Sequence, residues 1–391
     1  MSEEVSRYEL RGVSAKKEAV HKAIRNLDKG LFPNAFCKIL PDLVGGNAGH
    51  CNVMHADTAG TKTALAYLYW KETGDMSVWP GIIQDALVMN LDDMACVGIT
   101  DQIVISSTIG RNKHNIPDDV VGALIHGTSL FIEKMARLGI HLELAGGETA
   151  DVGDIVRTLD VGFTTFARCR RDEIIVNQMQ AGDVIVGFSS FGKASYEEHE
   201  NSGIGSNGLT SARHDVLSKY LAIKYPEAFD PATPESLIFS GNKKLSDAVE
   251  GSDLTVGQLL LSPTRTYLPL LKNILKKHRK VIHGMIHCTG GGQSKVLHFA
   301  DQIHIVKNNL FPIPAVFRLI QQESNAPWSE MYRVFNMGHR LEIYTDEGSA
   351  HLLIEEAGKL NIEAKIIGYT EVAETKLLTI TNEFGSWHYN S

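Results

Sequence analysis

Strand-like and helix-like segments alternate through the first half of the chain, and this alternation limits the fold more than any other feature. Residues 122–140 carry apolar side chains at helical spacing and reach Gly139, which can cap a helix C-terminus. Residues 141–154 begin as a strand that we expect to stop at the Gly146-Gly147 pair, and residues 158–169 follow as another strand. The pattern predicts a mixed α/β protein.

The second half continues the alternation after a polar stretch. Residues 181–192 predict a strand, whereas residues 192–208 are too hydrophilic to be expected in a core. Strand patterns return at residues 281–289 and 339–345. A length of 391 residues favours two domains over one. We expect a boundary near residue 177, with domains 1–177 and 178–391.

Composition excludes several classes of protein. No apolar run approaches the roughly 18 residues that span a bilayer, and the polar opening MSEEVSRYELRG argues against a secretory or transit peptide. Forty-six acidic and 38 basic side chains give a net charge of −8, which argues against nucleic-acid binding. Five scattered cysteines, never in C-x-x-C spacing, argue against structural zinc or a disulfide framework and favour the reducing cytoplasm.

Residues 52–65, NVMHADTAGTKTAL, run from an apolar strand into Asp57, a turn and a helix. The turn contains Gly60, Thr61 and Lys62. The familiar phosphate loop requires Gly and Lys to be adjacent, and Thr61 separates them here. A carboxylate, a bare backbone and an ammonium group within six residues nevertheless raise the question of a nucleotide phosphate.

A helix pattern over QDALVMNLDDMACVG carries three acidic residues. Asp85 and Asp92 share one face with Met89, and Asp93 follows directly. An acidic side chain on such an apolar helix is costly to bury without a partner. We therefore expect each buried carboxylate to meet a cation or a hydrogen-bond donor.

A third acidic turn follows a strand in LAGGETADVGD, where Gly146 and Gly147 precede Glu148. Magnesium takes hard oxygen ligands, usually one or two carboxylates with phosphate oxygens and water. Asp57, Asp93 and Glu148 could meet around Mg-ATP. Each of them is also explained by itself as a helix cap or a surface acid.

Two glycine-rich turns stand in the second half. GIGSNG (203–208) matches G-x-G-x-x-G but follows an acidic polar segment instead of a buried strand, so it lacks the context of a dinucleotide site. We expect Ser206 and Asn207 to cap a helix over residues 209–221 and to offer an anion site. A second candidate phosphate site lies at the start of another expected helix and consists of Thr289, Gly290, Gly291 and Gly292. For both sites, a plain flexible turn remains the alternative.

His283 and His287 lie on one side of the strand expected over residues 281–289. We expect no nearby cysteine or acid to complete a site with them, so packed or capping histidines are favoured over metal ligands. The chain contains no G-x-S-x-G, so a hydrolase nucleophile has no support.

Together these motifs resemble the aminoimidazole ribonucleotide synthetase (phosphoribosylformylglycinamidine cyclo-ligase) family, over about residues 8 to 370. The Asp and Gly-Thr-Lys pattern of that family is similar to Asp57 to Lys62, and its Gly-Gly-Glu-Thr-Ala is intact at residues 146–150. Its Met-x-x-Asn-Asp helix resembles residues 89–93, with Asp92 in place of Asn. The acidic turns are shared by a superfamily that includes thiamine-monophosphate kinase, selenophosphate synthetase and a hydrogenase-maturation dehydratase.

The second half carries the more discriminating strings. Ser-Asn-Gly stands at residues 206–208, Pro-Thr-Arg at 263–265 and Thr-Gly-Gly-Gly at 289–292, while EMYRVFNMG (330–338) is close to the Met-Tyr-Arg-Thr-Phe-Asn-x-Gly of the family. The chain lacks the reactive cysteine near an N-terminal glycine loop that selenophosphate synthetase would have. It also lacks the cysteine tail of the dehydratase.

Besides Asp92, the chain departs from the family pattern at three further places. Thr58-Ala59 replace the usual Gly-Val, and Gly205 stands where a histidine usually precedes Ser-Asn-Gly. His199, in an inserted acidic stretch, is a candidate replacement for that histidine. His339-Arg340 replace a usual small pair. These departures affect the amidine substrate more than the nucleotide lobe.

The resemblance implies an α/β (α+β) fold in two lobes, an N-terminal mixed-sheet domain for ATP binding and dimerisation and a C-terminal α/β sandwich domain for substrate. It implies ATP-dependent closure of formylglycinamidine ribonucleotide to aminoimidazole ribonucleotide, in a homodimer with no nucleic-acid or membrane partner. The general base is left open. The implied catalytic residues are Asp57, Lys62, Asp93 and Asn207; ATP would contact Gly60, Thr61, Lys62, Gly146, Gly147 and Glu148; Mg²⁺ would be held by Asp57, Asp93 and Glu148; substrate would contact Ser206, Asn207, Thr289, Gly290, Gly291 and Gly292.

Two other functions stay open on the sequence alone. One is an ATP-dependent kinase of another small metabolite, consistent with Gly205 and His339-Arg340. The other is a nucleotide-binding subunit that has lost its chemistry and regulates a partner.

Overall fold

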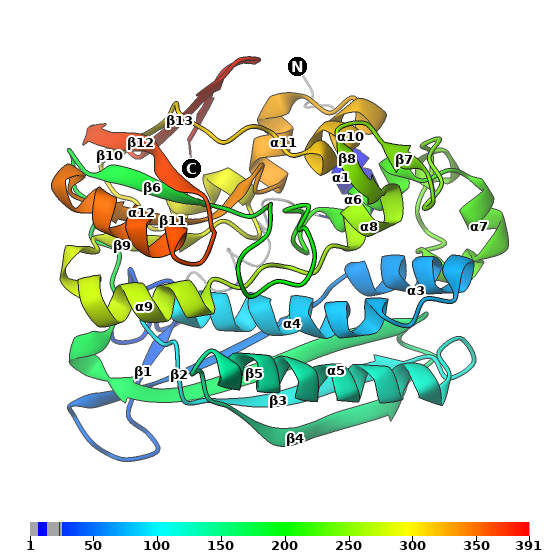
Figure 1. Cartoon of the computed structure of the whole chain (residues 1–391), viewed down its shortest axis with the longest axis horizontal. Coiled ribbons are helices and arrows are strands. Elements are labelled where there is room, and N and C mark those ends of the chain that lie inside the picture. Colours follow the sequence, from blue (N-terminus) through cyan, green and yellow to red (C-terminus); the bar gives the residue numbers. More distant parts are fainter. Residues whose placement is uncertain (1–6, 14–22, 24–25, 391) are drawn as a thin grey trace.

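A computed structural model describes residues 7–13, 23 and 26–390 of the chain. Residues 1–6, part of the polar opening discussed above, lie outside the described residues. None of the helices in the described ranges is both long and apolar enough to cross a lipid bilayer. Most of these residues belong to two lobes, each built on one β-sheet, and the lobes lie one above the other in Figure 1.

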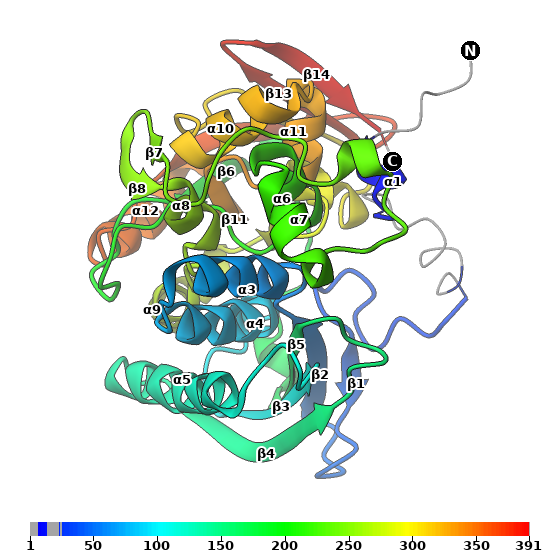
Figure 2. The same cartoon turned by 90° about the vertical axis from the view of Figure 1, so that its right-hand side faces the viewer.

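The first lobe is built on a five-stranded mixed sheet. Its order is β1-β2-β5-β3-β4, with β3 and β4 parallel and the other neighbours antiparallel. Helices α4 and α5 pack against each other and on one side of the sheet, and α3 packs on α4 (Figure 2). The bounds are β1 Ile39–Pro41, β2 His50–Thr58, α3 Lys62–Thr73, α4 Val78–Ala95, β3 Ile103–Arg111, α5 Asp118–Arg137, β4 Leu142–Asp151 and β5 Leu159–Arg170.

The second lobe is built on a seven-stranded sheet in the order β14-β13-β10-β12-β6-β11-β9, with β10 and β13 parallel. The strands are β6 Val184–Ser189, β9 Gly284–His287, β10 Ile303–Lys307, β11 His339–Thr345, β12 Ala364–Val372, β13 Leu377–Asn382 and β14 Gly385–Tyr389. A small hairpin pairs β7 (Ala248–Val249) with β8 (Ser252–Thr255). The remaining helices of the described chain are α1 Arg7–Leu10, α6 Leu209–Val216, α7 Tyr220–Lys224, α8 Val256–Leu261, α9 Leu268–His278, α10 Ala315–Ser324, α11 Trp328–Val334 and α12 Ala350–Gly358. The boundary predicted near residue 177 falls between β5 and β6.

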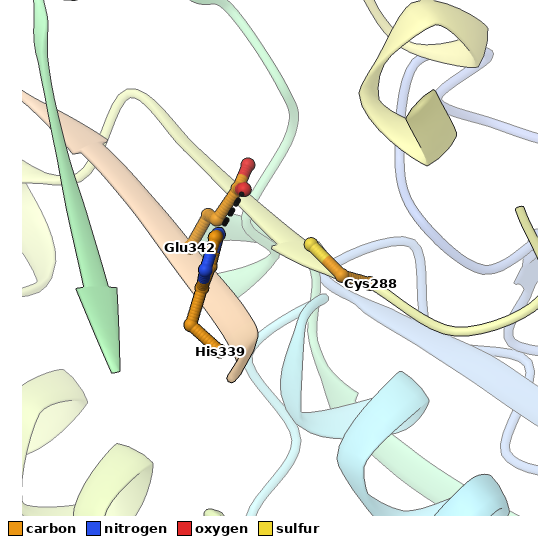
Figure 3. A group of neighbouring side chains, drawn as sticks. All are labelled: Cys288, His339 and Glu342. Carbon is orange, nitrogen blue, oxygen red and sulfur yellow. Dashed lines mark hydrogen bonds and ion pairs between the residues drawn. The ribbon is translucent and has the colours of Figure 1, made fainter. Parts of the chain in front are cut away.

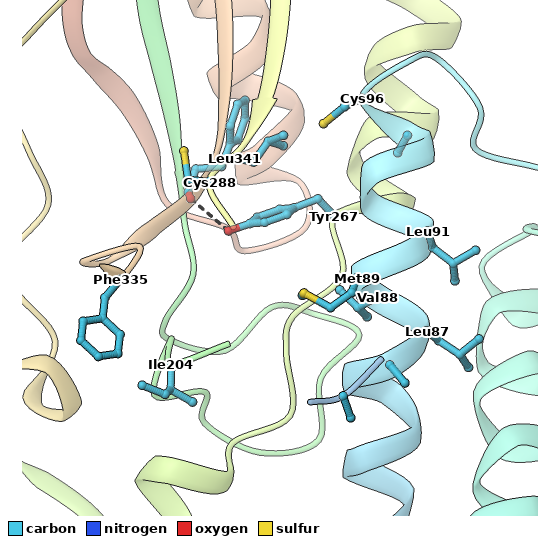
Figure 4. Close-up of a cluster of buried hydrophobic side chains, with 14 of the residues drawn as sticks. Leu87, Val88, Met89, Leu91, Cys96, Ile204, Tyr267, Cys288, Phe335 and Leu341 are labelled. Carbon is cyan, nitrogen blue, oxygen red and sulfur yellow. Dashed lines mark hydrogen bonds between the residues drawn. The ribbon is translucent and has the colours of Figure 1, made fainter. Parts of the chain in front are cut away.

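Helix α4 lies between the two lobes and is buried almost all round. In Figure 4, Leu87 and Leu91 point toward the α5 side, whereas Met89 points toward Tyr267 of the second lobe. A helix that is apolar on every side belongs in a core. Here that core is shared, because apolar residues of both lobes join one continuous buried cluster.

Periodicity located the regular elements well. The helix expected over residues 122–140 is α5, and Gly139 follows it with a positive φ of 76°. The strand expected over residues 158–169 is β5, and the strand at residues 339–345 is β11. Apolar spacing alone was sufficient for these elements: α5 and β5 pack mainly one side on the core, whereas every residue of β11 is buried.

The expected end of a strand at Gly146-Gly147 was wrong. Strand β4 runs through the pair to Asp151, and its register with β3 shifts between Ile105 and Ser107. Gly146 has a φ of 98°, a conformation that glycine adopts readily. The glycines therefore mark a β-bulge inside the strand, not its end.

The polar stretch at residues 192–208 was also partly misjudged, because residues 201–205 are buried. The side chain of Asn201 donates to Pro263 O at 2.8 Å, and Ser202 Oγ donates to Leu259 O at 2.7 Å. Polar residues can enter a core when their donors are satisfied in this way.

Candidate active site

The first predicted site element, the turn after β2, is open to solvent. Asp57 is exposed near the end of β2, and its Oδ1 accepts a hydrogen bond from the backbone N–H of Thr58 at 2.7 Å. Gly60 has a φ of 58°, and a Cβ built on it would meet no atom within 4 Å. The backbone at Gly60 therefore has free space beside it, which a ligand phosphate could occupy.

Lys62, at the start of α3, points away from this open space. Its ammonium group is fully buried and donates to Asp85 Oδ1 at 2.8 Å, to Gly205 O at 3.1 Å and to Ser262 O at 2.6 Å. Burial lowers the pKa of Lys62 below its usual value, against the opposing effect of Asp85. Phosphate binding by Lys62 stays a prediction, and it would require at least one of these contacts to open.

The buried acidic residues of α4 contact cations and hydrogen-bond donors, as expected from the sequence. Asp85 pairs with Lys62 and accepts a hydrogen bond from the backbone of Thr264 at 2.8 Å. Asp92 accepts from the hydroxyl of Thr266 at 2.7 Å and lies 3.7 Å from Nη2 of Arg340. Burial raises the pKa of both carboxyl groups. The prediction that buried acids on this helix need a cation or a donor is confirmed.

Asp93 is held between two histidines. Its Oδ1 lies 2.6 Å from Nδ1 of His287, and its Oδ2 lies 3.3 Å from Nε2 of His55. Burial alone would raise the pKa of Asp93, but the two histidines bring it well below its usual range. The expectation that no acid stands near His287 was wrong, because Asp93, which is 194 residues away in sequence, lies beside it in the fold.

The structure does not bring Asp57, Asp93 and Glu148 together within one chain. Across the sheet, the residue pairs Asp57–Phe163, Phe163–Ser107 and Ser107–Gly147 lie in register. Glu148 follows Gly147, so its side chain faces the other side of the sheet, three strands from Asp57. Shared binding of one metal ion by all three stays a prediction that needs more than a single chain.

The two glycine-rich turns of the second lobe lie side by side. A Cβ built on Gly290 would lie 3.9 Å from Oδ1 of Asn207, so the turn at residues 289–292 faces the turn at 205–208. Asn336 fixes the preceding backbone by donating to Gly203 O at 2.8 Å. Two segments that the sequence could only assign separately therefore form one local surface.

The expected caps at these turns are absent. Helix α6 begins at Leu209 after Gly208, and no side chain caps it, so the capping role expected for Ser206 and Asn207 was wrong. The turn at residues 289–292 leads into a short 3₁₀ helix, Gly292–His298. Gly290, Gly291 and Gly292 all have positive φ, which explains the three consecutive glycines.

The replaced pair His339-Arg340 is buried behind these turns. Arg340 donates from Nε to Nε2 of His287 at 3.0 Å, and its guanidinium lies 5.1 Å from the ring centre of Tyr267. A Cβ built on Gly205 would lie 3.9 Å from Cδ of Arg340. Arg340 thus occupies space directly behind Gly205, whereas His199 is exposed and its suggested catalytic role stays a prediction.

Among the described residues, one group of acidic, histidine and cysteine side chains is close enough to hold a metal ion. It consists of Cys288, His339 and Glu342, all buried (Figure 3). The ammonium group of Lys307 already donates to Glu342 at 2.5 Å, and Nε2 of His339 lies 2.9 Å from the same carboxylate oxygen. A lysine supplies the positive charge in this cluster, so we assign no metal to it.

The ion pairs of Glu342 in this cluster lead to a prediction of how stability depends on pH. Burial would raise the pKa of Glu342, but Lys307 and His339 lower it from 4.5 to about 2. The unfolded chain therefore binds this proton more readily than the folded chain, and the stability contributed by Glu342 is lost as pH falls from 4.5 to about 2. In urea unfolding at several pH values, the free energy of unfolding should fall less steeply with decreasing pH in Glu342→Gln than in the unsubstituted protein. Equal slopes would contradict the assignment.

Comparison of the sequence with known proteins identifies relatives of this chain. Residues 38–169 match the family model described as AIR synthase related protein, N-terminal domain. The phosphoribosylformylglycinamidine cyclo-ligase of Methanocaldococcus jannaschii is 34% identical over 320 residues, covering 81% of this chain and 77% of that protein. That of Methanococcus maripaludis is 27% identical over 392 residues and covers 97% of both chains.

Solved structures support the fold alone. The chain aligns over 97% of its length with 99% of a chain of the HypE-HypF complex, at a TM-score of 0.57 and 14% identity. It aligns over 96% of both chains with AaThiL complexed with AMPPCP and TMP, at a TM-score of 0.51 and 12% identity. Both neighbours share the two-lobed mixed α/β fold expected from the sequence.

Proposed function

The chain belongs to the phosphoribosylformylglycinamidine cyclo-ligase family, and we propose that its active site lies between the open Gly60 turn and the paired glycine turns of the second lobe. The enzyme is a ligase of purine biosynthesis. It closes formylglycinamidine ribonucleotide to aminoimidazole ribonucleotide and consumes ATP in doing so.

One observation supports this location above all others. The Gly60 turn continues directly into Thr61 and Lys62, and both side chains reach the segment that carries Ser206 and Asn207. The candidate nucleotide turn and the candidate substrate turns are therefore neighbours, although about 150 residues separate them in sequence. Phosphoryl transfer between two bound molecules requires such proximity.

The chemistry explains why the site must hold both molecules. An amide carbonyl is a poor electrophile, so its oxygen first accepts the γ-phosphate of ATP. The amidine nitrogen then attacks the activated carbon, and phosphate leaves in place of hydroxide. In this scheme Ser206, Asn207 and the turn at residues 289–292 hold the ribose phosphate and the amide. Holding both reacting ends of one molecule can remove about 7–11 kcal/mol of the barrier.

ATP and magnesium fit the open end of the first lobe. AaThiL, which shares the fold, is complexed with AMPPCP, an ATP analogue. In this chain, Gly60 leaves space for phosphate oxygens, and Asp57 supplies an exposed carboxylate nearby. Magnesium, when bound, would neutralise the phosphate charge during transfer. Glu148 would join Asp57 only if a second copy of the chain brought it there, and Asp93 would have to leave its histidines.

The outer side of the first sheet supports the proposal of a homodimer. Met54 and Val104 both pair in register with Phe166, and together they form an apolar row on the side away from α4 and α5. Met54 is 61% exposed and Val104 is 37% exposed. Contiguous exposed apolar residues of this kind mark interaction sites, and a second copy of the same sheet would cover them.

We expect the double substitution Met54→Glu, Val104→Glu to convert the dimer to a monomer, because it places charges on the apolar row. Light scattering at micromolar concentration would measure the mass. Ile223→Glu is the matched control, since Ile223 is 81% exposed on α7 of the other lobe. A monomeric unsubstituted protein, or a double variant that remains dimeric, would contradict the proposed interface.

The activity itself is tested by incubating the pure protein with Mg-ATP and formylglycinamidine ribonucleotide. ADP and the imidazole product should form together in equal amounts. Formation of ADP without cyclisation would favour a kinase of a related metabolite. Absence of ADP with every candidate substrate would favour a nucleotide-binding subunit without chemistry.

A further inference from the structure

Three contacts join the Gly60 turn and its helices to the segment of residues 205–210, which we call the substrate loop. Thr61 Oγ1 lies 2.5 Å from Thr210 Oγ1, and Lys62 Nζ donates to Gly205 O at 3.1 Å. The third contact is indirect, because Ser206 Oγ lies 3.3 Å from Thr264 Oγ1 and Thr264 is bound to Asp85 of α4. The contacts fall on both ends of the substrate loop, so they fix its position relative to the first lobe.

Two of these contacts are made by residues that directly follow the Gly60 turn, where we propose that the nucleotide binds. Thr61 and Lys62 follow Gly60 without an intervening residue, so a ligand that shifts the turn shifts their side chains as well. Thr61 and Thr210 are both half-buried, while Lys62 is fully buried. A displacement at the turn therefore reaches the substrate loop through side chains that are already packed.

We propose that Thr61 and Thr210 are positioning residues that couple nucleotide binding at the Gly60 turn to substrate binding at the substrate loop. This inference rests on the proposed function. The hydroxyl–hydroxyl bond holds the loop in the orientation in which Asn207 faces the turn at residues 289–292. Such coupling is reciprocal, so each ligand raises the affinity for the other by the same factor.

The threonine pair is a better probe of this coupling than Lys62. Removal of Lys62 would leave Asp85 buried and unpaired, and the whole protein would lose stability. Thr210→Val removes one hydroxyl and keeps the shape of the side chain. Thr210→Ser keeps the hydroxyl and serves as the conservative rescue.

Calorimetry with AMPPCP, which cannot transfer its γ-phosphate, gives the coupling directly. The Kd of AMPPCP is measured with and without saturating formylglycinamidine ribonucleotide, and the ratio of the two values is the coupling factor. We expect a factor of about 5 to 150 in the unsubstituted protein. In Thr210→Val the factor should approach 1, while the Kd of AMPPCP alone stays within about twofold; in Thr210→Ser the factor should return.

Steady-state kinetics provide a second readout that a purely structural role would not produce. At saturating ATP, Thr210→Val should raise the KM for substrate by about the lost coupling factor and leave kcat nearly unchanged. The double variant Thr61→Val, Thr210→Val should raise this KM no further than Thr210→Val alone, because both substitutions remove the same bond.

The outcomes separate this inference from the proposed function. Full coupling in Thr210→Val, or product formation by an unsubstituted protein that shows no coupling, would overturn the inference and leave the function intact. An unsubstituted protein that binds neither ligand would overturn the function. If Thr210→Val unfolds, as judged by circular dichroism, Thr210→Ala decides between the same outcomes.

Discussion

Asp57→Asn is expected to lower product formation by about 10²- to 10³-fold, the scale at which loss of one preorganised charge-stabilising group affects catalysis. Asp57 lies beside the open Gly60 turn, where the proposed Mg-ATP would need an anionic oxygen ligand. Because the carboxylate is exposed, its neutralisation should leave the fold intact. Release of ADP and formation of the imidazole product, measured together, give the effect.

The matched control for this experiment is Asp154→Asn. Asp154 is also an exposed acid of the first lobe, and it follows β4, an edge strand that lies three strands away from β2. It has no assigned contact with ATP or metal, so its variant should keep full activity. Unchanged turnover in Asp57→Asn, or an equal loss in both variants, would contradict the assignment of Asp57.

Lys307→Met is expected to destabilise the protein by about 3–5 kcal/mol, the usual cost of leaving a buried charge without its partner. The side chains of Lys307 and Glu342 are both fully buried, and they are 2.5 Å apart. Lys307 also donates to the backbone and side chain of Gln293, both at 2.9 Å. Methionine fills a similar volume, so the loss reports charge and hydrogen bonding. Urea unfolding at neutral pH measures it.

A surface ion pair provides the comparison. Lys359 pairs with Glu355 and Glu356, both at 2.9 Å, but it is half exposed and Glu356 keeps Lys277 as a second partner, so Lys359→Met should cost much less stability than Lys307→Met. Adding Glu342→Gln to Lys307→Met should recover part of the lost stability, because the unpaired carboxylate is then neutral. A Lys307→Met protein as stable as the Lys359→Met protein would show that the buried pair contributes nothing.

Local sequence patterns predicted those helices and strands whose apolar residues recur at regular helical or strand spacing. Helix α5 and strands β5 and β11 each present an apolar side to the core, and that regularity is visible along the chain. Strand β4 was cut short because a glycine pair reads as a turn, whereas the structure uses it as a bulge. The buried segment at residues 201–205 was missed because its polar groups are satisfied by backbone atoms far away in sequence.

The site divides in the same way. The strand, Asp57, the Gly60 turn and the following helix could be predicted, because all the residues involved are adjacent. The partners of the α4 acids could not be predicted, since Asp85 meets Thr264 and Asp93 meets His287 only after the lobes pack together. For the same reason the sequence suggested a phosphate contact for Lys62, whose ammonium group in the structure is occupied by Asp85 and the substrate loop.

Helix α4 has a consequence for modular evolution and for engineering. Its sequence belongs to the segment that matches the N-terminal family domain, and Asp85 keeps Lys62 of that segment as its counter-charge. Asp92, however, meets Thr266 and Arg340, and Asp93 meets His287, all in the other half of the polypeptide. If either half were transferred into another protein, buried charges at this contact would lose the partners that the other native half supplies. The halves can therefore be exchanged between homologues only if the helix and its receiving surface are inherited as a pair.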